Sequence, residues 1–168
     1  MDNRNFYTCC FTGHRPKNLP WRYNEKGLKF FITKHKLKKI IKSVILSGYN
    51  HFITGMALGI DILCAEIVLQ YKNKYPHIVL ECAIPCKKQT QKWKKESIKK
   101  YNIIFQSADK ITYVSNSNYY NGCMQKRNKY MVDNSNLIIA VFNGNSGGTK
   151  QTIDYAKSKN IEIIIIKL

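Results

Sequence analysis

The feature that most constrains this chain is the continuous apolar run Leu-Ile-Ile-Ala-Val-Phe at residues 137–142. A strand that is apolar at every position is typical of a parallel sheet with helices on both faces. Further strand-like runs lie at 7–12, 52–54, 78–84, 110–114 and 162–166, and helical apolar stripes separate them at 28–44, 61–72, 87–106, 123–133 and up to about 158. This alternation predicts an α/β fold: a single Rossmann-like domain over residues 1–168, with a mostly parallel sheet covered on both faces.

The composition limits the class of protein. No apolar run approaches the roughly 20 residues that span a bilayer, and the N-terminus lacks an apolar signal-peptide core. We therefore expect a cytoplasmic protein with no membrane partner. The six cysteines show no Cys-x-x-Cys pair and the four histidines no metal-ligand spacing, so we expect reduced thiols and no metal site.

The chain carries a formal net charge of +18, from 28 basic and 10 acidic residues. One explanation is a coding bias, because Lys, Asn and Ile are all abundant. Such a bias enriches Glu as well, however, and acids are few. The other explanation is a surface or site that attracts anions, such as nucleic acid or phosphate-bearing ligands. The sequence leaves both open.

Ligands of doubly wound sheets bind at the carboxyl ends of the strands, so the loops after the strands are the candidate site. The first loop, at residues 12–16, places Gly13 and His14 beside Arg15, whose guanidinium suits a phosphate. The second, at 55–61, is a glycine-rich turn between a strand and a helix, a layout that points backbone N–H groups at an anion. The third, at 143–149, offers N–H groups and a hydroxyl before a helix. Taken alone, the first loop is better explained as a plain surface loop, and the third is equally well explained as a flexible surface turn.

Two further readings stay open at this stage. Asp61 fits either a helix N-terminal acid or an acceptor for ribose hydroxyls. Gln89 and Trp93, four residues apart, suggest a helix face that holds a base, although a tryptophan in the core is the commoner case. The chain contains no GxGxxG fingerprint, Walker A loop, HExxH or nucleophile elbow, and Cys123 near a helix start fits a buried thiol better than a reactive one.

Taken together, the loops resemble the YpsA-like family of the SLOG superfamily, which also holds DprA and the LOG proteins. The matching motifs, in chain order, are Thr-Gly-His-Arg-Pro at 12–16, Thr-Gly-Met-Ala-Leu-Gly-Ile-Asp at 54–61, the spaced residues Pro85, Gln89 and Trp93, Arg-Asn at 127–128 with Met-Val-Asp at 131–133, and Gly-Gly-Thr at 147–149. The resemblance covers nearly the whole chain. It implies a Rossmann-like protein that binds nucleotides or their derivatives, such as NAD, ADP-ribose or a nucleoside monophosphate, in a sensing or regulatory role.

The sister groups supply the alternatives. DprA-like proteins bind single-stranded DNA, which would suit the +18 charge. LOG enzymes are phosphoribohydrolases whose motif PGGxGTxxE carries a catalytic Glu, and Thr152 stands at that position here. An N-glycosidase would then need Asp61 or Glu66 instead, so the sequence favours binding over catalysis and leaves enzymatic activity open.

The resemblance also implies a homo-oligomer as a candidate assembly, because many SLOG proteins self-associate. With no catalytic and no metal-binding residues assigned, the expected ligand-binding residues are Gly13, His14, Arg15, Gly55, Met56, Ala57, Gly59, Asp61, Arg127, Asn128, Gly147, Gly148 and Thr149.

Overall fold

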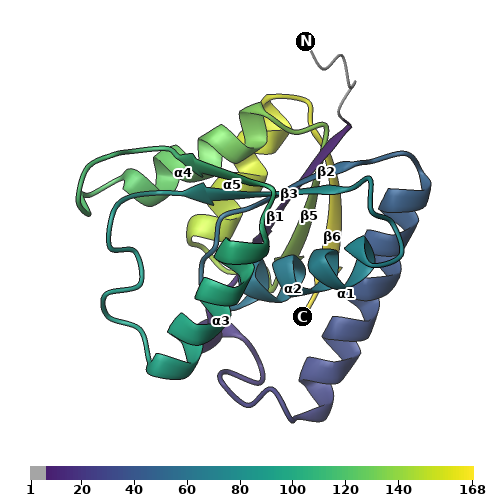
Figure 1. Cartoon of the computed structure of the whole chain (residues 1–168), viewed down its shortest axis with the longest axis horizontal. Helices are drawn as coiled ribbons and strands as arrows, with labels where there is room; N and C mark the ends of the chain where they lie inside the picture. The colour runs from purple at the N-terminus through teal and green to yellow at the C-terminus, as the bar shows by residue number, and fades with distance from the viewer. Residues whose placement is uncertain (1–6) are drawn as a thin grey trace.

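Within residues 7–168, six parallel strands form one sheet in the order β4-β3-β2-β1-β5-β6, and five α-helices cover it (Figure 1). The computed structural model describes residues 7–168, so residues 1–6 of the expected domain lie outside the described part. The strands are β1 (Thr8–Gly13), β2 (His51–Thr54), β3 (Val79–Ile84), β4 (Lys110–Tyr113), β5 (Leu137–Phe142) and β6 (Glu162–Lys167). The helices are α1 (Leu28–Leu46), α2 (Ile60–Lys72), α3 (Lys95–Ser107), α4 (Cys123–Asp133) and α5 (Gly148–Ser158), with a short 3₁₀ turn η1 (Pro16–Asn18).

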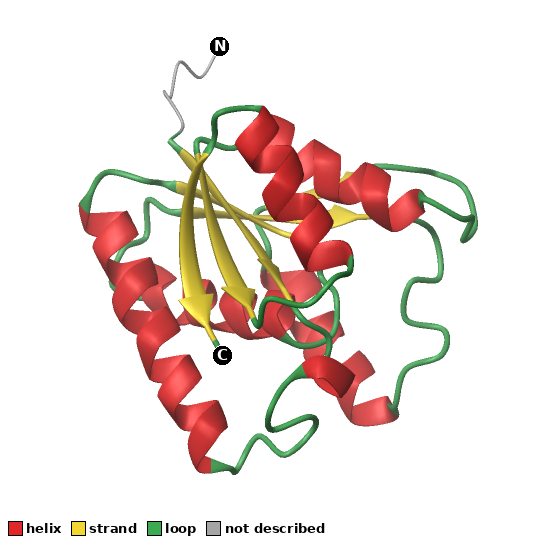
Figure 2. Ribbon diagram, turned by 180° about the vertical axis from the view of Figure 1, so that it is seen from behind, coloured by secondary structure: helices red, strands yellow, loops and turns green. Residues whose placement is uncertain are grey.

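The chain builds outward from the centre of the sheet and then crosses back. Strands β1 to β4 follow one another to one edge, after which α4 returns the chain to β5, beside β1. Helices α1, α2 and α3 lie on one face of the sheet, and α4 and α5 lie on the other (Figures 1 and 2). The strand order therefore reverses between β1 and β5, and the carboxyl ends of these two strands border a topological switch point.

The observed fold confirms the predicted α/β class with a parallel sheet and helices on both faces. Helix α4 and strand β5 begin and end at the predicted residues. The helical reading of residues 87–94 was wrong. Lys88 has a φ of 60° and Lys94 is extended at the start of α3, with a ψ of 151°, so this segment forms turns and helix α3 starts only at Lys95.

The four inner strands β1, β2, β3 and β5 are buried on both faces, whereas the edge strands β4 and β6 are mostly exposed or half-buried. The two cores differ in size. On β1, Cys9 and Phe11 face the larger core under α1, α2 and α3, whereas Cys10 faces the smaller one under α4 and α5. This alternation explains why residues 137–142 are apolar at every position. All six cysteines lie within the described residues and are buried and free.

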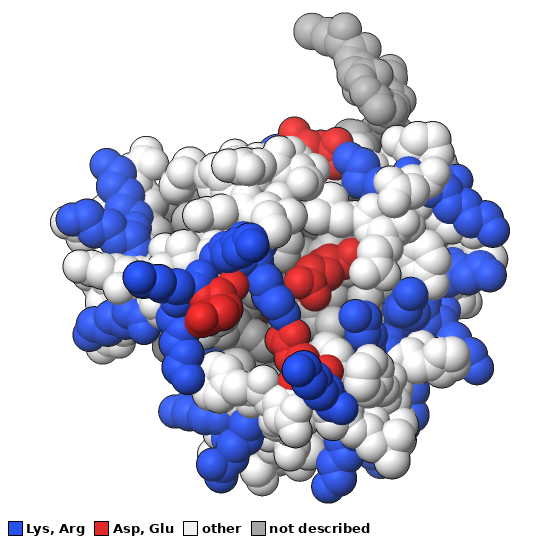
Figure 3. Space-filling view, turned by 60° about the horizontal axis from the view of Figure 1, so that its bottom comes forward, with Lys and Arg blue, Asp and Glu red and all other residues white. Residues whose placement is uncertain are grey.

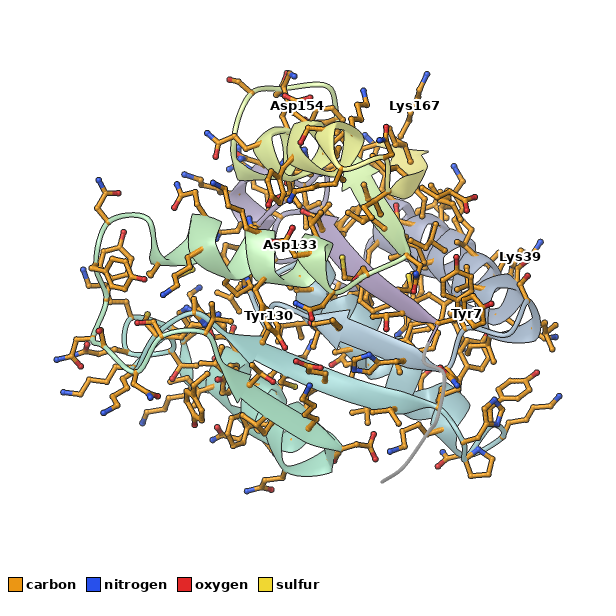
Figure 4. All side chains as sticks on the ribbon, turned by 90° about the horizontal axis from the view of Figure 1, so that it is seen from above. Tyr7, Lys39, Tyr130, Asp133, Asp154 and Lys167 are labelled. Atoms are coloured by element: carbon orange, nitrogen blue, oxygen red, sulfur yellow. The ribbon has the colours of Figure 1, made fainter. Side chains whose placement is uncertain are left out.

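A buried carboxylate holds the sheet and α4 together. Glu81 of β3 is fully buried and accepts hydrogen bonds from Tyr130 (2.6 Å) and Thr112 (2.7 Å). It also pairs with Lys110 (2.9 Å) and His51 (3.0 Å). Tyr130 reaches it from α4, on the sheet side of that helix (Figure 4). Burial by itself would raise the pKa of Glu81, but these donors hold it at about 2, so the group is ionised at neutral pH.

Basic side chains dominate the visible surface of the α1–α3 side, where acidic ones form a small group among them (Figure 3). Between residues 7 and 168, no helix combines the length and the apolar character needed to cross a membrane. Over the same residues, no three His, Cys, Asp or Glu side chains come together as a set of metal ligands.

Candidate functional site

A cavity of about 490 Å³ opens at the switch point, where the sequence places its motif loops. It lies beyond the carboxyl ends of β1 and β5, next to the first turns of α4 and α5. Its lining comes from four separate segments of the chain: Phe11–Arg15 with Lys17 and Asn18, Ala57 with Asp61, Met124 with Arg127 and Asn128, and Ser146–Thr149.

The loop after β1 forms one wall and exposes a cation. Gly13 packs against α2 so closely that a Cβ atom there would lie 2.6 Å from Cγ1 of Ile60, which explains why glycine is needed. Arg15 is exposed at the cavity, and no hydrogen bond or ion pair within the described residues holds its guanidinium. Arg15 is therefore free to meet an anion.

His14 braces this wall. Its Nε2 accepts the backbone N–H of Asn143 at 3.2 Å, and its ring stacks on Phe142 with centroids 5.7 Å apart. Because Nε2 accepts, the remaining proton of the neutral ring sits on Nδ1. Burial lowers the pKa of His14 below its ordinary value. The imidazole therefore ties the loops after β1 and β5 together and brings no charge to the cavity at neutral pH.

The turn before α5 is the open wall. Gly147 has a φ of 141°, a conformation that favours glycine, and it gives α5 no side-chain cap. Gly148 has an ordinary φ and nothing within 4 Å of the position that a Cβ would take. Neither strain nor packing inside the protein accounts for a glycine there. The N–H groups of the first turn of α5 lack intrahelical acceptors. Because Gly147, Gly148 and Thr149 line the cavity, these groups are available as donors to an anion there.

The loop after β2, by contrast, is filled by the protein itself. A Cβ atom at Gly55 would lie 2.5 Å from Cζ of Arg127 and 2.7 Å from Oδ2 of Asp61. At Gly59, whose φ is 98°, it would lie 2.5 Å from the carbonyl oxygen of His14. These glycines have packing reasons that need no ligand.

Other contacts fasten the same loop. Met56 is fully buried in the larger core and has a φ of 56°, and its N–H donates to Oγ1 of Thr54 at 3.2 Å. Gln89 donates to the carbonyl oxygens of Gly55 (3.3 Å) and Met56 (3.1 Å). Gln89 thus supports the loop from behind, and Trp93 packs edge-on against Tyr101, 5.6 Å away, at the margin of the core. The pair does not form a helix face.

Asp61 and Arg127 make the floor of the cavity. Both are buried, and Asp61 accepts a weak hydrogen bond from the N–H of Ala57 at 3.4 Å. Burial raises the pKa of Asp61, an effect that the attraction of Arg127 and the bond from Ala57 oppose. Burial likewise lowers the pKa of Arg127, against the attraction of Asp61. Arg127 also donates from Nη1 to the carbonyl oxygen of Gly55, so each charge offsets part of the cost of burying the other.

Ten of the thirteen expected ligand-binding residues line the cavity, and Gly55, Met56 and Gly59 lie behind its wall. The structure adds lining residues that sequence reasoning did not select: Phe11, Thr12, Lys17, Asn18, Met124 and Ser146. Most of them lie next to the Gly-His-Arg or Gly-Gly-Thr motif in the sequence, and this proximity could have identified them as lining residues. Glu66 instead lines a second cavity of about 410 Å³, bordered by Trp21 and Phe30.

Comparisons with known proteins identify a family for this chain. A model of the YspA SLOG family matches residues 9–167. The SPbeta prophage-derived protein YoqJ of Bacillus subtilis is 35% identical over 136 residues, which cover 74% of this chain and 80% of that protein. A UPF0398 protein of Brevibacillus brevis is 29% identical over 142 residues, covering 83% of this chain and 75% of that one.

Among solved structures, DNA processing protein A from Helicobacter pylori superposes with a TM-score of 0.65 and 15% sequence identity. The match covers 96% of this chain and 66% of the other, just under two thirds of its length. That protein is described as having a unique single-stranded DNA binding mode. At this identity the likeness bears on the fold alone.

Proposed function

This chain belongs to the YspA SLOG family, as its loop motifs predict, and we propose that it binds a nucleotide or nucleotide derivative in the cavity at the β1–β5 switch point. The observation that carries the proposal is the open turn before α5. Gly148 has neither a conformational nor a packing reason to be glycine, and it borders that cavity. Close approach of a ligand to the backbone is the remaining physical reason.

The charges around the turn favour a phosphate as the approaching group. The first turn of α5 presents free N–H groups and the positive end of the helix dipole. Arg15 is exposed across the cavity, and Lys17 lines it as well. A phosphate between these groups would receive hydrogen bonds from the backbone and a bidentate contact from the guanidinium.

Asp61 suits the sugar end of such a ligand. Its carboxyl group lines the same cavity as the turn. Burial raises the pKa of this group, and the attraction of Arg127 opposes that rise and favours the ionised form. A carboxylate there accepts hydrogen bonds from ribose hydroxyls. A ligand that places a phosphate at the turn and a ribose at the carboxylate is a nucleoside phosphate, such as NAD, ADP-ribose or a nucleoside monophosphate.

We propose binding rather than cleavage of this ligand. The position of the LOG-type catalytic acid holds Thr152, whose hydroxyl is bonded to Gly148 and Asn128. Of the two substitute acids, Glu66 borders a different cavity and Asp61 is partly neutralised by Arg127. An N-glycosidase mechanism therefore has one acid available, Asp61. Incubation of nucleotides with the wild type and with Asp61→Asn, followed by chromatography, tests it. The variant is compared only after its thermal unfolding shows that it is folded, and the absence of released base from the wild type would exclude cleavage.

Calorimetric titration with NAD, ADP-ribose and AMP tests the binding proposal directly. We expect saturable binding of at least one of them, and a loss of roughly tenfold or more for Arg15→Gln because a charge-assisted contact is removed. Arg22→Gln is the matched control, since Arg22 is also exposed but lines the other cavity. The absence of binding at millimolar concentrations of all three ligands would overturn the proposal.

A second candidate is a single-stranded nucleic acid as the ligand. It draws on the net charge of +18 and on the exposed Arg15 and Lys17 at the mouth of the cavity. Nucleic acid binding that relies on phosphate contacts weakens steeply as salt rises. Titration of an unstructured oligonucleotide at several salt concentrations separates the cases: a saturable complex with a steep salt slope supports this candidate, and unsaturable binding confined to low salt contradicts it.

A further inference from the structure

Four hydrogen bonds run in series from the loop after β2 to the turn before α5. Arg127 donates from Nη1 to the carbonyl oxygen of Gly55 and from Nε to Oδ1 of Asn128, the latter at 2.8 Å. Asn128 donates from Nδ2 to Oγ1 of Thr152 at 3.0 Å. Thr152 donates to the carbonyl oxygen of Gly148 at 2.8 Å. We call these three side chains, Arg127, Asn128 and Thr152, the relay.

The direction of every bond in the relay is fixed by chemistry. A guanidinium can only donate, so the amide of Asn128 must turn its oxygen toward Arg127 and its nitrogen toward Thr152. The hydroxyl of Thr152 then accepts from the amide and gives its own proton to Gly148. Since Arg127 and Thr152 are both buried, with 4% of each exposed, water does not readily replace these partners.

The relay joins the two ends of the cavity. One end is the floor, where Arg127 lies beside Asp61 and Gly55. The other end is Gly148, the open glycine that begins α5. Helices α4 and α5 pack against each other, but the relay is what links the polar groups of the floor to the turn itself.

We propose that Asn128 and Thr152 are positioning residues, which hold the turn at Gly147–Thr149 at a fixed distance from the Asp61–Arg127 floor so that one ligand can contact both. This inference rests on the proposed function of the cavity. Thr152 then has a role where a LOG enzyme has its catalytic acid: it carries a hydrogen bond between the two ends of the site and transfers no proton to the ligand.

The test is Thr152→Val, which keeps the shape of the side chain and removes its hydrogen bonds, measured with AMP and with adenosine. We expect the affinity for AMP to fall about tenfold while that for adenosine changes little, because the phosphate turn loses its register and the floor does not. Thr152→Ser restores the hydroxyl and should restore AMP binding, which a purely packing role would not predict. Thr33→Val is the matched control, a buried threonine on α1 that is remote from the cavity.

A ligand-free measurement keeps this inference separate from the proposed function. In amide NMR spectra, Thr152→Val should shift the signals of Met56 and Ala57, across the relay, and Thr152→Ser should leave them near their wild-type positions. If the wild type binds neither AMP nor adenosine, the proposed function fails, and these shifts alone test the relay. Equal effects of Thr152→Val on both ligands, or unshifted signals at Met56 and Ala57 in that variant, would overturn it.

Discussion

The substitution Gly148→Ala separates a ligand-binding glycine from a structural one, because the two roles predict opposite effects on stability. A Cβ atom at this position meets nothing within 4 Å, and the residue begins helix α5 with an ordinary φ. Alanine is favoured over glycine in helices by about 0.5–1 kcal/mol. We therefore expect the variant to be at least as stable as the wild type, with Tm raised by roughly 1–4 °C for a chain of this size.

The same methyl group should damage phosphate binding. It would occupy the open space above the first N–H groups of α5, where we place the phosphate. Losing one hydrogen bond to a charged group costs roughly 1.5–3 kcal/mol, or about 10- to 150-fold in Kd. Differential scanning fluorimetry and calorimetry on one preparation measure both effects.

Gly27→Ala is the control for this experiment. Gly27 is the N-cap residue of α1, with a φ of −80°, and it does not line the cavity. A Cβ atom there would meet its nearest neighbour at an ordinary 3.5 Å. It should leave ligand affinity unchanged. If Gly148→Ala binds AMP, NAD or ADP-ribose as the wild type does, the phosphate does not approach this turn, and the reasoning from the empty Cβ position fails.

Three further predictions concern other parts of the chain. Gly55→Ala should lower the free energy of unfolding by roughly 2–4 kcal/mol in a chemical denaturation experiment, because its Cβ would sit 2.5 Å from Cζ of Arg127. Arg15→Gln should leave Tm within about 1 °C of the wild type while weakening phosphate ligands, since the side chain is exposed. The pKa of Glu81 in the folded state, about 2, lies below its ordinary value, so the unfolded chain binds more protons than the folded chain as pH falls. The free energy of unfolding should therefore fall by roughly 2–3 kcal/mol between about pH 5 and 2. Glu81→Gln should flatten that part of the curve of stability against pH.

The sequence predicts the order and type of the elements because each carries its own periodicity. Residues 137–142 are apolar throughout since the strand is covered on both faces, and α4 starts after Gly122, whose φ of 97° stops any earlier helix. The segment 87–94 misled the same reasoning. Its lysines and Trp93 fit helical spacing, but Lys88 takes a left-handed conformation and Gln89 is held by the carbonyl groups of Gly55 and Met56. Those partners are more than thirty residues away in the chain, beyond the reach of a local pattern.

The site is predictable to the level of its loops and no further. Local spacing shows that Gly55 and Gly148 both follow strands and precede helices, so the sequence assigns both to the ligand. Only the tertiary structure shows that Arg127 fills the space at Gly55 and that nothing fills it at Gly148. The buried carboxylate of Glu81 lay beyond the same reasoning, because its partners come from β2, β4 and α4 and share no spacing in the chain.

Substitutions of the buried pair Asp61 and Arg127 are hard to interpret as tests of ligand binding. Removing Asp61 or Arg127 alone leaves the other charge buried without its counterpart, which typically costs 3–5 kcal/mol of stability. A loss of ligand binding in either variant would therefore report partial unfolding as readily as a lost contact. Arg15 is exposed, and a Cβ atom at Gly148 would meet nothing within 4 Å, so substitutions at these positions carry no such penalty. Variants at these two positions isolate the ligand's own contribution. The relay variant Thr152→Val, which is neutral in charge, probes the link between the turn and the floor and leaves both charges of the buried pair in place.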